Sequence, residues 1–342
     1  MVKAARKRSA MNSQFFTIGI DLGGTKLATA LVDSSGRILA ETKLPTVPEE
    51  LSKFGPDDVI PPAAVRRHIE YVVETMADSV SKVLEKAPAK KKLLGVGLAS
   101  AGPMNIEKGT LDHPTNIRGW KVVPLVDHLK KALAKRKIKT PVAFQNDAIA
   151  AALGEGWIGS AKGCNTFVVI TVGTGIGTGV IFNGKPAQSR GMGSEWGHMF
   201  VDCRGLSDET RNYEYHTAEG YASGKWLMIR AKDRGFKGEH AGDLAEAARA
   251  GDPLALELFK ESSEALASLF CSLSLGFHVE KIVISGGMLA VRDCFLPNAV
   301  SLYQKIMKDR FPEFLAPVRI AKLGTRAGVI GAARLPILEN LS

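Results

Sequence analysis

The chain has 342 residues, 45% of them hydrophobic and 23% charged, a composition typical of a globular protein that buries a core without disulfide bonds. Its length predicts about two domains, its 35 glycines and 16 prolines fall short of the share typical of disordered chains, and no apolar run is long enough for a transmembrane helix. The 45 Lys and Arg residues outnumber the 35 Asp and Glu residues, and the resulting net charge of +10 suits an anionic substrate without requiring one.

Residues 1–13 are basic and contain no acid, and we expect them to be a disordered tail. They lack the apolar run of a secretory signal and the aromatic residues that would accompany a nucleic-acid-binding arm. A solvated tail is therefore favoured, with a short organelle-targeting segment left open. The positive charges of this tail are Lys3, Arg6, Lys7 and Arg8.

The four cysteines lie far apart in the sequence, and no pair has the spacing of metal ligands. Together with the missing export signal, this pattern predicts reduced thiols and a cytoplasmic location. The lack of a transmembrane run predicts that the chain has no membrane partner. The cysteines are Cys164, Cys203, Cys271 and Cys294.

Three strands open the predicted fold. Short apolar runs predict strands over Thr17–Asp21 and Leu27–Asp33 and a third strand through about Leu44. Glycine-containing turns separate these runs, which predicts an antiparallel meander.

The next elements alternate between helix and strand. A proline-rich loop over residues 45–62 precedes a long helix from about Ala63 to Lys86, where apolar residues recur at helical spacing. A strand over Leu93–Leu98, a helix near Leu125–Lys135 and a strand over Val142–Gln145 follow. This alternation predicts a parallel part of the sheet.

The second half of the sequence echoes the first, with an apolar strand, a Gly/Thr turn and another apolar strand, which we interpret as a weak internal repeat. Residues 183–224 are expected to be mostly loop, and helices are expected to dominate from there to about Leu275. The remaining predicted elements are a helix starting over Ala148–Leu153, strands over Thr166–Val172, Val180–Phe182, Lys281–Ser285 and Val318–Ala321, and a closing helix over Val329–Leu338.

Two Gly/Thr turns are the first chemical signal, because a turn without side chains lets backbone N–H groups approach phosphate oxygens closely. Neither turn is a Walker A loop or a dinucleotide-binding fingerprint, since the second turn leads into a strand and not into a helix. Either turn alone could be a plain hairpin. Their repetition, and Gly286-Gly287 after a third strand, favours phosphate binding.

Four stretches together resemble a known family. Ile18–Lys26 (IGIDLGGTK) is similar to the first phosphate motif of the actin and hexokinase ATPase superfamily, Thr171–Gly177 (TVGTGIG) to its second, and Val283–Gly287 (VISGG) to its adenosine motif. Gly191–His198 (GMGSEWGH) narrows the resemblance to the ROK sugar kinases. The similarity runs from about Thr17 to Ala333.

The resemblance implies an α/β fold of two ribonuclease H-like lobes of the actin-like ATPase kind, with mixed sheets and an interlobe cleft. Residues 14–146 and the C-terminal helix 327–342 would form the smaller N-terminal lobe, and residues 147–326 the larger C-terminal lobe. Many members of the family are homodimers, so a homodimer is expected here as well.

The resemblance also assigns the nucleotide site. ATP would bind between the lobes with Mg²⁺, and Asp21 would lie near the metal, bridged to it by water. Mg²⁺ keeps several waters and takes few protein carboxylates, so one or two acids suffice. The implied nucleotide-binding residues are Asp21, Gly23, Gly24, Thr25, Lys26, Gly173, Thr174, Gly175, Gly177, Gly286 and Gly287.

A hexose presents hydroxyls around its ring, and an unpaired buried hydroxyl costs about 1–3 kcal/mol, so a sugar site needs many fixed polar groups. The resemblance implies that Asp147 accepts the proton of the attacking hydroxyl. By residue type alone, other interpretations stay open: an N-cap pair at Asn146-Asp147, a surface pair at Glu195 and His198, and local helix or turn roles for the rest. The implied sugar-binding residues are Asn116, Asn146, Asp147, Glu195, His198 and Glu219.

The sequence departs from the family at a zinc motif, C-x-C-G-x-x-G-C-x-E, that many members carry. Counted back from Glu219, its cysteine positions hold Thr210, Asn212 and Thr217 here, and Cys203 is the thiol nearest to them. One cysteine and one histidine cannot complete a four-ligand zinc site. We therefore expect no zinc, with His198 left free for the sugar.

The leading hypothesis is an ATP-dependent hexose kinase, a glucokinase in the first instance, that phosphorylates the sugar 6-hydroxyl. Fructose, mannose, N-acetylmannosamine and N-acetylglucosamine stay open as substrates. A sugar-responsive DNA-binding regulator is disfavoured, because about sixteen residues before the first strand are too few for a helix-turn-helix domain. A non-catalytic sensor with the kinase fold is the remaining alternative.

Overall fold

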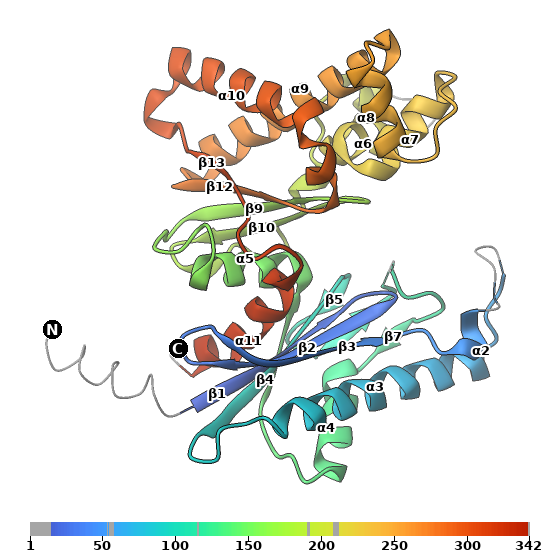
Figure 1. The fold of residues 1–342 in the computed structure, drawn as a ribbon, viewed down its shortest axis with the longest axis vertical. Coiled ribbons are helices and arrows are strands. Elements are labelled where there is room, and N and C mark those ends of the chain that lie inside the picture. The colour runs from blue at the N-terminus through green and yellow to red at the C-terminus, as the bar shows by residue number, and fades with distance from the viewer. Residues whose placement is uncertain are drawn as a thin grey trace, which may run out of the picture. The chain divides into compact units, whose positions relative to one another are not determined.

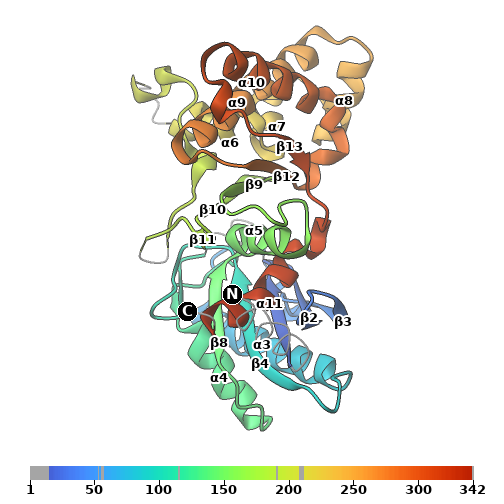
Figure 2. The same cartoon turned by 90° about the vertical axis from the view of Figure 1, so that its left-hand side faces the viewer.

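The computed structural model describes residues 15–52, 54, 58–114, 116–189, 192–207 and 212–340 (Figures 1 and 2). The predicted basic tail, residues 1–13, lies outside these residues. The chain divides into two compact units. Unit 1 comprises Met1–Ile158, Gln188–Gly193 and Arg326–Ser342, and unit 2 comprises Gly159–Ala187 and Ser194–Thr325. Helix α5 (Asp147–Ile158) belongs to unit 1, whereas the sequence boundary assigned it to the second lobe.

Unit 1 is built on a five-stranded sheet in the order β3-β2-β1-β4-β8. The antiparallel meander is confirmed, and β4 and β8 run parallel to β1 as the alternation of elements predicted. The strands are β1 (Phe15–Leu22), β2 (Lys26–Asp33), β3 (Ile38–Pro45), β4 (Lys92–Ser100) and β8 (Val142–Asn146).

Helices cover both faces of the unit 1 sheet (Figure 1). Ile18 and Ile20 of β1 share one hydrophobic core with α3 (Pro62–Leu84) and α4 (Leu125–Lys135). Gly19 points the other way, because successive side chains alternate along a strand, and it lies against Val329 and Ala333 of α11 (Ala327–Glu339). A side chain at Gly19 would overlap the α11 backbone, so this glycine sets the close approach of helix to sheet.

Short elements complete unit 1. The predicted proline-rich loop contains one helical turn, α2 (Glu49–Ser52), and Pro62 begins α3 at a position where its missing N–H is harmless. A small sheet, not predicted from the sequence, is formed by β5 (Met104–Asn105), β6 (Thr110–Asp112) and β7 (Val122–Val123).

Unit 2 repeats the topology of unit 1, with a five-stranded sheet in the order β11-β10-β9-β12-β13. Strand β10 starts at Ile176 and pairs with β9 from there, so the expectation that residues 176–179 belong to the glycine turn is wrong. The strands are β9 (Phe167–Val172), β10 (Ile176–Phe182), β11 (Lys185–Pro186), β12 (Lys281–Ser285) and β13 (Val318–Ile320).

The helices of unit 2 gather on one face of its sheet (Figure 1). Ile282 and Ile284 of β12 pack in one core with Phe270 of α9 and Tyr303 of α10. The predicted loop over residues 183–224 holds the short 3-10 helices η1 (Trp196–His198), η2 (Cys203–Ser207) and η3 (Tyr213–His216). The α-helices are α6 (Ala218–Ala222), α7 (Gly224–Asp233), α8 (Ala241–Arg249), α9 (Pro253–Phe277) and α10 (Leu296–Arg310), and the other 3-10 helices are η4 (Gly287–Cys294), η5 (Pro312–Phe314) and η6 (Gly324–Arg326).

None of the helices in the described residues combines the length and the apolar character that a membrane span requires.

Candidate functional site

The predicted catalytic residue Asp147 and the predicted metal-binding residue Asp21 lie at one edge of the unit 1 sheet, where its parallel strands end. Leu22, which follows Asp21 on β1, pairs with Ser100 on β4, and Ser100 pairs with Asn146 on β8. Because neighbouring strands are about 4.8 Å apart, Asp21 and Asn146 stand on strands separated by about 10 Å. The structure therefore brings Asp21, Asn146 and Asp147 to the same edge of one sheet.

Asn146 and Asp147 form the junction between β8 and α5. The Oδ1 atom of Asn146 accepts hydrogen bonds from the backbone N–H groups of Ala148, at 2.9 Å, and Ile149, at 3.2 Å. Asp147 Oδ1 accepts a further bond from Ala148 N at 2.8 Å. Asn146 thus caps the helix, and within the described chain no group accepts a hydrogen bond from its Nδ2. The capping role leaves that amide nitrogen for another partner.

Both carboxyl groups have raised pKa values. Burial, and after it the charge of Asp147, raises the pKa of Asp21 to about 6. Burial also raises the pKa of Asp147, although the Ala148 N–H partly opposes the rise. A carboxylate with a raised pKa is a stronger base than a solvated one, so this environment favours proton acceptance by Asp147.

The surroundings of Asp21 fit a divalent cation. The Asp21 carboxylate packs against the first turn of α11, where a side chain at Gly328 would overlap it. Among the described residues, no Lys, Arg or His side chain contributes to the pKa shift of the Asp21 or the Asp147 carboxyl. Two acids without a neutralising partner suit a hard oxygen-seeking ion such as Mg²⁺. Gly328 was not singled out from the sequence, because its contact with Asp21 joins opposite ends of the chain.

The first predicted phosphate turn joins β1 to β2. The backbone N–H of Gly23 donates to Lys26 O at 2.9 Å and closes the turn, as expected for a hairpin. Gly24 lies against the backbone carbonyl of Asn116, which a Cβ would overlap. Asn116 itself is exposed. The structure therefore places a predicted phosphate-binding residue in contact with a predicted sugar-binding residue of the same unit.

The second predicted phosphate turn joins β9 to β10. Gly173 N donates to Gly175 O at 2.9 Å within the turn. The carbonyls of Gly173 and Thr174 accept from Gly224 N, at 2.7 Å, and Lys225 N, at 3.3 Å. The first residues of α7 therefore hold the shape of this turn.

The third glycine pair, Gly286-Gly287, follows β12, the parallel neighbour of β9, and therefore lies at the same sheet edge as Gly173. Gly286 needs to be glycine, because its φ is 101° and a side chain would overlap the backbone of Val172. Packing does not require glycine at positions 287 and 173. A Cβ at Gly287 would meet nothing within 4 Å, and a Cβ at Gly173 would meet only Gly287 N, at 4.0 Å. These two glycines border open space, as a backbone that receives a phosphate requires.

Glu219 connects α6 to the start of β10. Its Oε2 atom accepts a hydrogen bond from Ile176 N at 2.6 Å, and a Cβ at Gly175 would lie 2.6 Å from that oxygen. Thr217 caps α6 by accepting from Gly220 N at 3.0 Å, which places Glu219 in the first helical turn. Glu219 is thus a carboxylate in the first turn of α6, as residue type alone allowed. Gly175, which is predicted to bind phosphate, leaves the space that the Glu219 carboxylate occupies.

Glu195 directly precedes η1 and His198 is its last residue, and both side chains are exposed. The hydroxyl of Thr178 on β10 accepts a hydrogen bond from Trp196 N at 3.0 Å. Gly197 packs against the β10 backbone, where a side chain would overlap a carbonyl. Strand β10 therefore fixes the segment that carries both predicted sugar ligands, with Thr178 as a support that the sequence analysis missed.

His198 has a partner that the sequence analysis also missed. Its Nδ1 atom lies 3.0 Å from each carboxylate oxygen of Glu214. Burial alone would lower the pKa of His198, but the hydrogen bond and charge of Glu214, together with Glu219 and Glu195, raise it above its usual value. The expectation that His198 is left free for the sugar therefore stays a prediction that concerns Nε2, because Nδ1 is engaged by Glu214. The sequence signal was weak, since only an acid shortly before Glu219 marks the position.

The donor atoms of His198, Glu214 and Glu219 all lie within 4.8 Å of one another. Of the positions that replace the family's cysteines, Thr210 lies outside the described residues, Asn212 precedes η3, and Thr217 caps α6. None of these side chains supplies the thiolate of a structural zinc site. The absence of zinc stays a prediction.

A hollow of about 620 Å³ lies elsewhere in unit 2, between the segment that follows His198 and helix α9. None of the predicted site residues lines it. Its polar lining includes Asp202, Arg204, Tyr221, Arg230 and Glu261.

Comparison with known proteins gives one consistent result. The sequence profile described as the ROK family matches residues 17–338. The chain is 29% identical to a glucokinase of Streptomyces coelicolor, over 93% of this chain and 96% of the relative. It is 30% identical to an N-acetylmannosamine kinase of Haemophilus influenzae, over 92% of this chain and 93% of the relative.

Solved structures agree with the sequence comparison. A ROK hexokinase from Thermus thermophilus superposes with a TM-score of 0.80 at 28% identity, covering 96% of this chain and 99% of the other. A ROK family glucokinase from Streptomyces griseus, solved with glucose and AMPPNP, gives a TM-score of 0.65 at 29% identity, covering 94% and 98% of the two chains. These similarities confirm the predicted actin-like ATPase fold class.

Proposed function

The chain belongs to the ROK family, and we propose that it is an ATP-dependent hexose kinase that acts on glucose and phosphorylates its 6-hydroxyl. The glucokinase relative and the glucokinase solved with glucose and AMPPNP support this assignment. The observation in this chain that carries it is the pair Gly173 and Gly287. Neither packing nor backbone conformation requires glycine there, and both border open space at one sheet edge.

In this proposal the glycine turns bind the nucleotide through their backbone. The proposed residues are the eleven that the resemblance to the family implied, among them Gly173 and Gly287 in unit 2 and Gly23 and Gly24 in unit 1. Asp21 would hold Mg²⁺ through water, and the ion would offset the negative charge of the phosphate oxygens. Phosphoryl transfer of this kind depends mainly on positioning and on charge stabilisation.

Asp147 acts as the general base. Its carboxylate accepts the proton of the sugar 6-hydroxyl while the hydroxyl oxygen attacks the γ-phosphorus of ATP, and ADP leaves from the opposite side. The raised pKa of Asp147 and the fixed position of its Oδ1 on Ala148 N support this role. Asn146 would donate a hydrogen bond to the sugar from its unengaged Nδ2.

The other proposed sugar ligands supply both donors and acceptors. Glu219, with one oxygen on Ile176 N, and Glu195 accept from sugar hydroxyls, and His198 offers its Nε2. Asn116, packed on Gly24, contributes an amide. A site that pairs hydroxyls in this way rejects sugars that lack them, because each buried group left unpaired costs about 1–3 kcal/mol.

A second substrate class is an N-acylhexosamine, which the N-acetylmannosamine kinase relative favours. Purified protein tested with glucose, fructose, mannose, N-acetylmannosamine and N-acetylglucosamine, with ATP, ADP or polyphosphate as donor, separates the candidates by ADP release and by sugar phosphate formed. The proposal predicts the highest kcat/KM for glucose with ATP and Mg²⁺. Absence of phosphorylation of every sugar would contradict it. We also propose a homodimer and a cytoplasmic location, which light scattering and cell fractionation would test.

A further inference from the structure

Resting on the proposed function, we propose that Glu214 is a positioning residue that sets the orientation and tautomer of His198. The carboxylate of Glu214 holds the Nδ1 edge of the imidazole, so that the opposite nitrogen, Nε2, is presented to a sugar hydroxyl. Glu214 would not touch the sugar, and its effect would pass through His198.

The contact itself fixes the proton on His198. An ionised carboxylate only accepts hydrogen bonds, so the Nδ1 atom that lies 3.0 Å from both oxygens of Glu214 carries the proton. In the neutral ring Nε2 is then an acceptor, and in the protonated ring it is a second donor. Without Glu214 nothing in this contact would select the tautomer.

Glu214 is held on both sides by its own chain. Its backbone carbonyl accepts from Thr217 Oγ1, at 2.8 Å, and Thr217 N, at 3.1 Å. The same carbonyl lies against Gly220, where any side chain would overlap it. The Thr217 hydroxyl also lies 3.3 Å from Glu214 Oε2, so both the backbone and the carboxylate of Glu214 are anchored at the start of α6.

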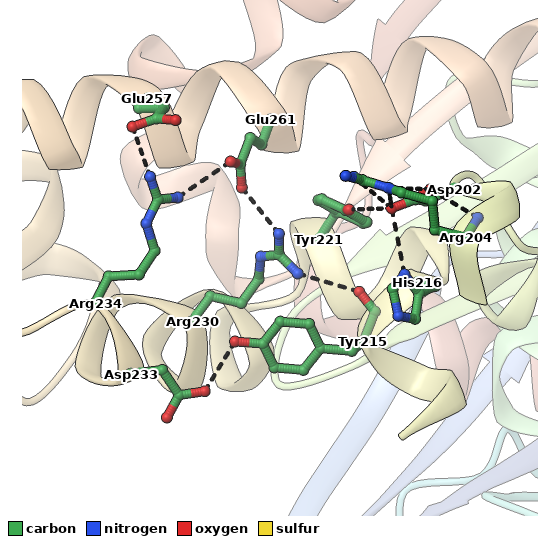
Figure 3. A network of polar contacts seen from close by, with 10 residues as sticks. All are labelled: Asp202, Arg204, Tyr215, His216, Tyr221, Arg230, Asp233, Arg234, Glu257 and Glu261. Atoms are coloured by element: carbon green, nitrogen blue, oxygen red, sulfur yellow. Dashed lines mark hydrogen bonds and ion pairs between the residues drawn. The ribbon is translucent and has the colours of Figure 1, made fainter. Parts of the chain in front are cut away.

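The residue after Glu214 is anchored by a buried arginine (Figure 3). Arg230 of α7, only 8% exposed, donates to Tyr215 O at 3.1 Å and to the Glu261 carboxylate of α9 at 3.0 Å. Its guanidinium lies 4.6 Å from the ring centre of Tyr215 and 3.9 Å from that of Tyr221. Stacking between two rings adds to the ion pair, so Arg230 fixes Tyr215 to two helices.

The segment is also tied at its other end, near Asp202 (Figure 3). Asp202 accepts a hydrogen bond from the Tyr221 hydroxyl at 3.0 Å and contacts His216 Nδ1 at 3.3 Å. Asp202 also forms an ion pair with Arg204 at 2.7 Å. This pair is the largest of the contributions that lower the pKa of the Asp202 carboxyl, so the carboxyl stays charged. Polar contacts thus hold Asp202 before Glu214 in the chain and Tyr215 and Thr217 after it.

The Glu214–His198 pair contributes little to stability. The Glu214 and His198 side chains are 42% and 49% exposed, and ion pairs of this exposure add little to the stability of a fold. A purely structural role would therefore leave substrate binding almost unchanged when the pair is removed. A positioning role would instead appear in substrate binding, with stability nearly constant.

The test compares Glu214→Ala, Glu214→Gln and Glu214→Asp with the control Glu257→Gln. Glu257 pairs with Arg234 at 2.6 Å in the same polar region and does not contact His198. Loss of one charge-assisted hydrogen bond predicts that Glu214→Ala raises KM for the sugar about tenfold or more, with kcat changed far less. KM for the sugar in Glu214→Gln should lie between the values of the wild type and of Glu214→Ala. Glu214→Asp should recover part of the lost affinity, and Glu257→Gln should have the KM of the wild type. Unchanged KM in Glu214→Ala would overturn the proposal.

A second measurement does not depend on activity. NMR of the histidine ring nitrogens, with the His198 signal assigned by its loss in His198→Gln, should show the proton on Nδ1 in the wild type and a shift toward the Nε2–H form in Glu214→Ala. The same tautomer in both proteins would overturn the proposal even if the enzyme phosphorylates no sugar. A metal bound by the wild type and lost in Glu214→Gln would also overturn it, because Glu214 would then be a ligand.

Discussion

The sheets of the two units have the same strand order and carry different chemistry where their parallel strands end. In unit 1 the ends of β1 and β8 carry Asp21, Asn146 and Asp147. In unit 2 the position that corresponds to Asp21, one residue before the end of β9, holds Thr171, and the turns that follow β9 and β12 hold glycines. Both edges therefore have glycine turns, but in unit 1 the ends of the strands add acidic side chains, whereas in unit 2 the end of β9 holds Thr171.

The comparison shows what topology decides and what it leaves to individual residues. Parallel strands bring their carboxyl ends to one edge in both sheets, which makes that edge a place where distant residues meet. Whether the edge handles protons and cations or phosphate oxygens depends on the side chains at its turns. Changes at corresponding places in the two units should therefore have different consequences.

The largest expected effect comes from the acidic edge. Asp147→Asn should lower kcat by about 10²–10⁴-fold, because an amide cannot take the proton of the sugar hydroxyl, while sugar binding persists. Steady-state kinetics and sugar binding by calorimetry measure the two effects separately. Asp127→Asn, which changes an exposed aspartate in the first turn of α4 of the same unit, is the matched control and should be neutral. Near-normal turnover of Asp147→Asn would remove the residue from its proposed role.

The glycines of the two edges should respond in opposite ways to the same change. Gly24→Ala in unit 1 forces a methyl group into the Asn116 backbone and should lower the free energy of unfolding by about 1–3 kcal/mol. Gly287→Ala in unit 2 meets open space and should change stability by less than about 0.5 kcal/mol, but it should raise KM for ATP. Urea unfolding and ATP kinetics of both variants check this contrast. Equal losses of stability would mean that the unit 2 edge is packed and does not receive a phosphate.

Protonation of Asp21, at the acidic edge of the unit 1 sheet, should stabilise the protein. The pKa of Asp21 is raised to about 6, so the folded state holds this proton more tightly than the unfolded chain does. Its contribution to stability is therefore complete below about pH 4 and is lost as the pH rises through about 6. In the presence of EDTA, Asp21→Asn should raise the free energy of unfolding at pH 7 by about 1–3 kcal/mol, while it lowers activity with Mg²⁺.

Asp33 on β2 of the same sheet provides the opposite control. Burial works to raise its pKa, but hydrogen bonds from Ser35 and Arg37 outweigh burial and lower it. Its stabilising contribution is therefore present above about pH 4 and is lost as the pH falls through its lowered pKa. Asp33→Asn should destabilise the protein at pH 7. Melting temperatures of both variants should be measured from pH 4 to pH 8. Relative to the wild type, the melting temperature should rise with pH for Asp21→Asn and fall for Asp33→Asn. The same trend in both variants would contradict the environment described for Asp21.

Local patterns in the sequence predict one part of this structure and miss another. The helix expected over Ala63–Lys86 is α3, Pro62–Leu84, because apolar periodicity over six turns is a strong signal. The two- and three-residue strands β5–β7 carry no periodicity and were not predicted. The strand over Thr17–Asp21 is the centre of β1, whereas the start of β10 was missed because Gly177 and Gly179 look like turn residues.

The candidate site divides in the same way. Residues such as Asn146 and Asp147 follow an apolar strand directly, and their place at a sheet edge follows from that local order. The contacts of Gly24 with Asn116 and of His198 with Glu214 join residues far apart in the sequence. Such contacts depend on how the turns pack in three dimensions, so residue type and spacing give at most a weak signal for them.

The smallest expected effect concerns the described residues on both sides of Glu214, from Met199 to Ser207 and from Asn212 to Thr217. Arg230 donates to the Tyr215 carbonyl and Asp202 accepts from the Tyr221 hydroxyl, and we expect these polar contacts, and not a metal, to hold these residues. Dialysis against EDTA should therefore leave the midpoint of thermal unfolding unchanged, and metal analysis should find far less than one zinc per chain. Arg230→Met, by contrast, should lower the midpoint, because it leaves the Tyr215 carbonyl without this donor and leaves Glu261 with Arg234 alone as its cationic partner. A full equivalent of zinc, with a midpoint that falls on chelation, would show that a metal and not Arg230 holds these residues.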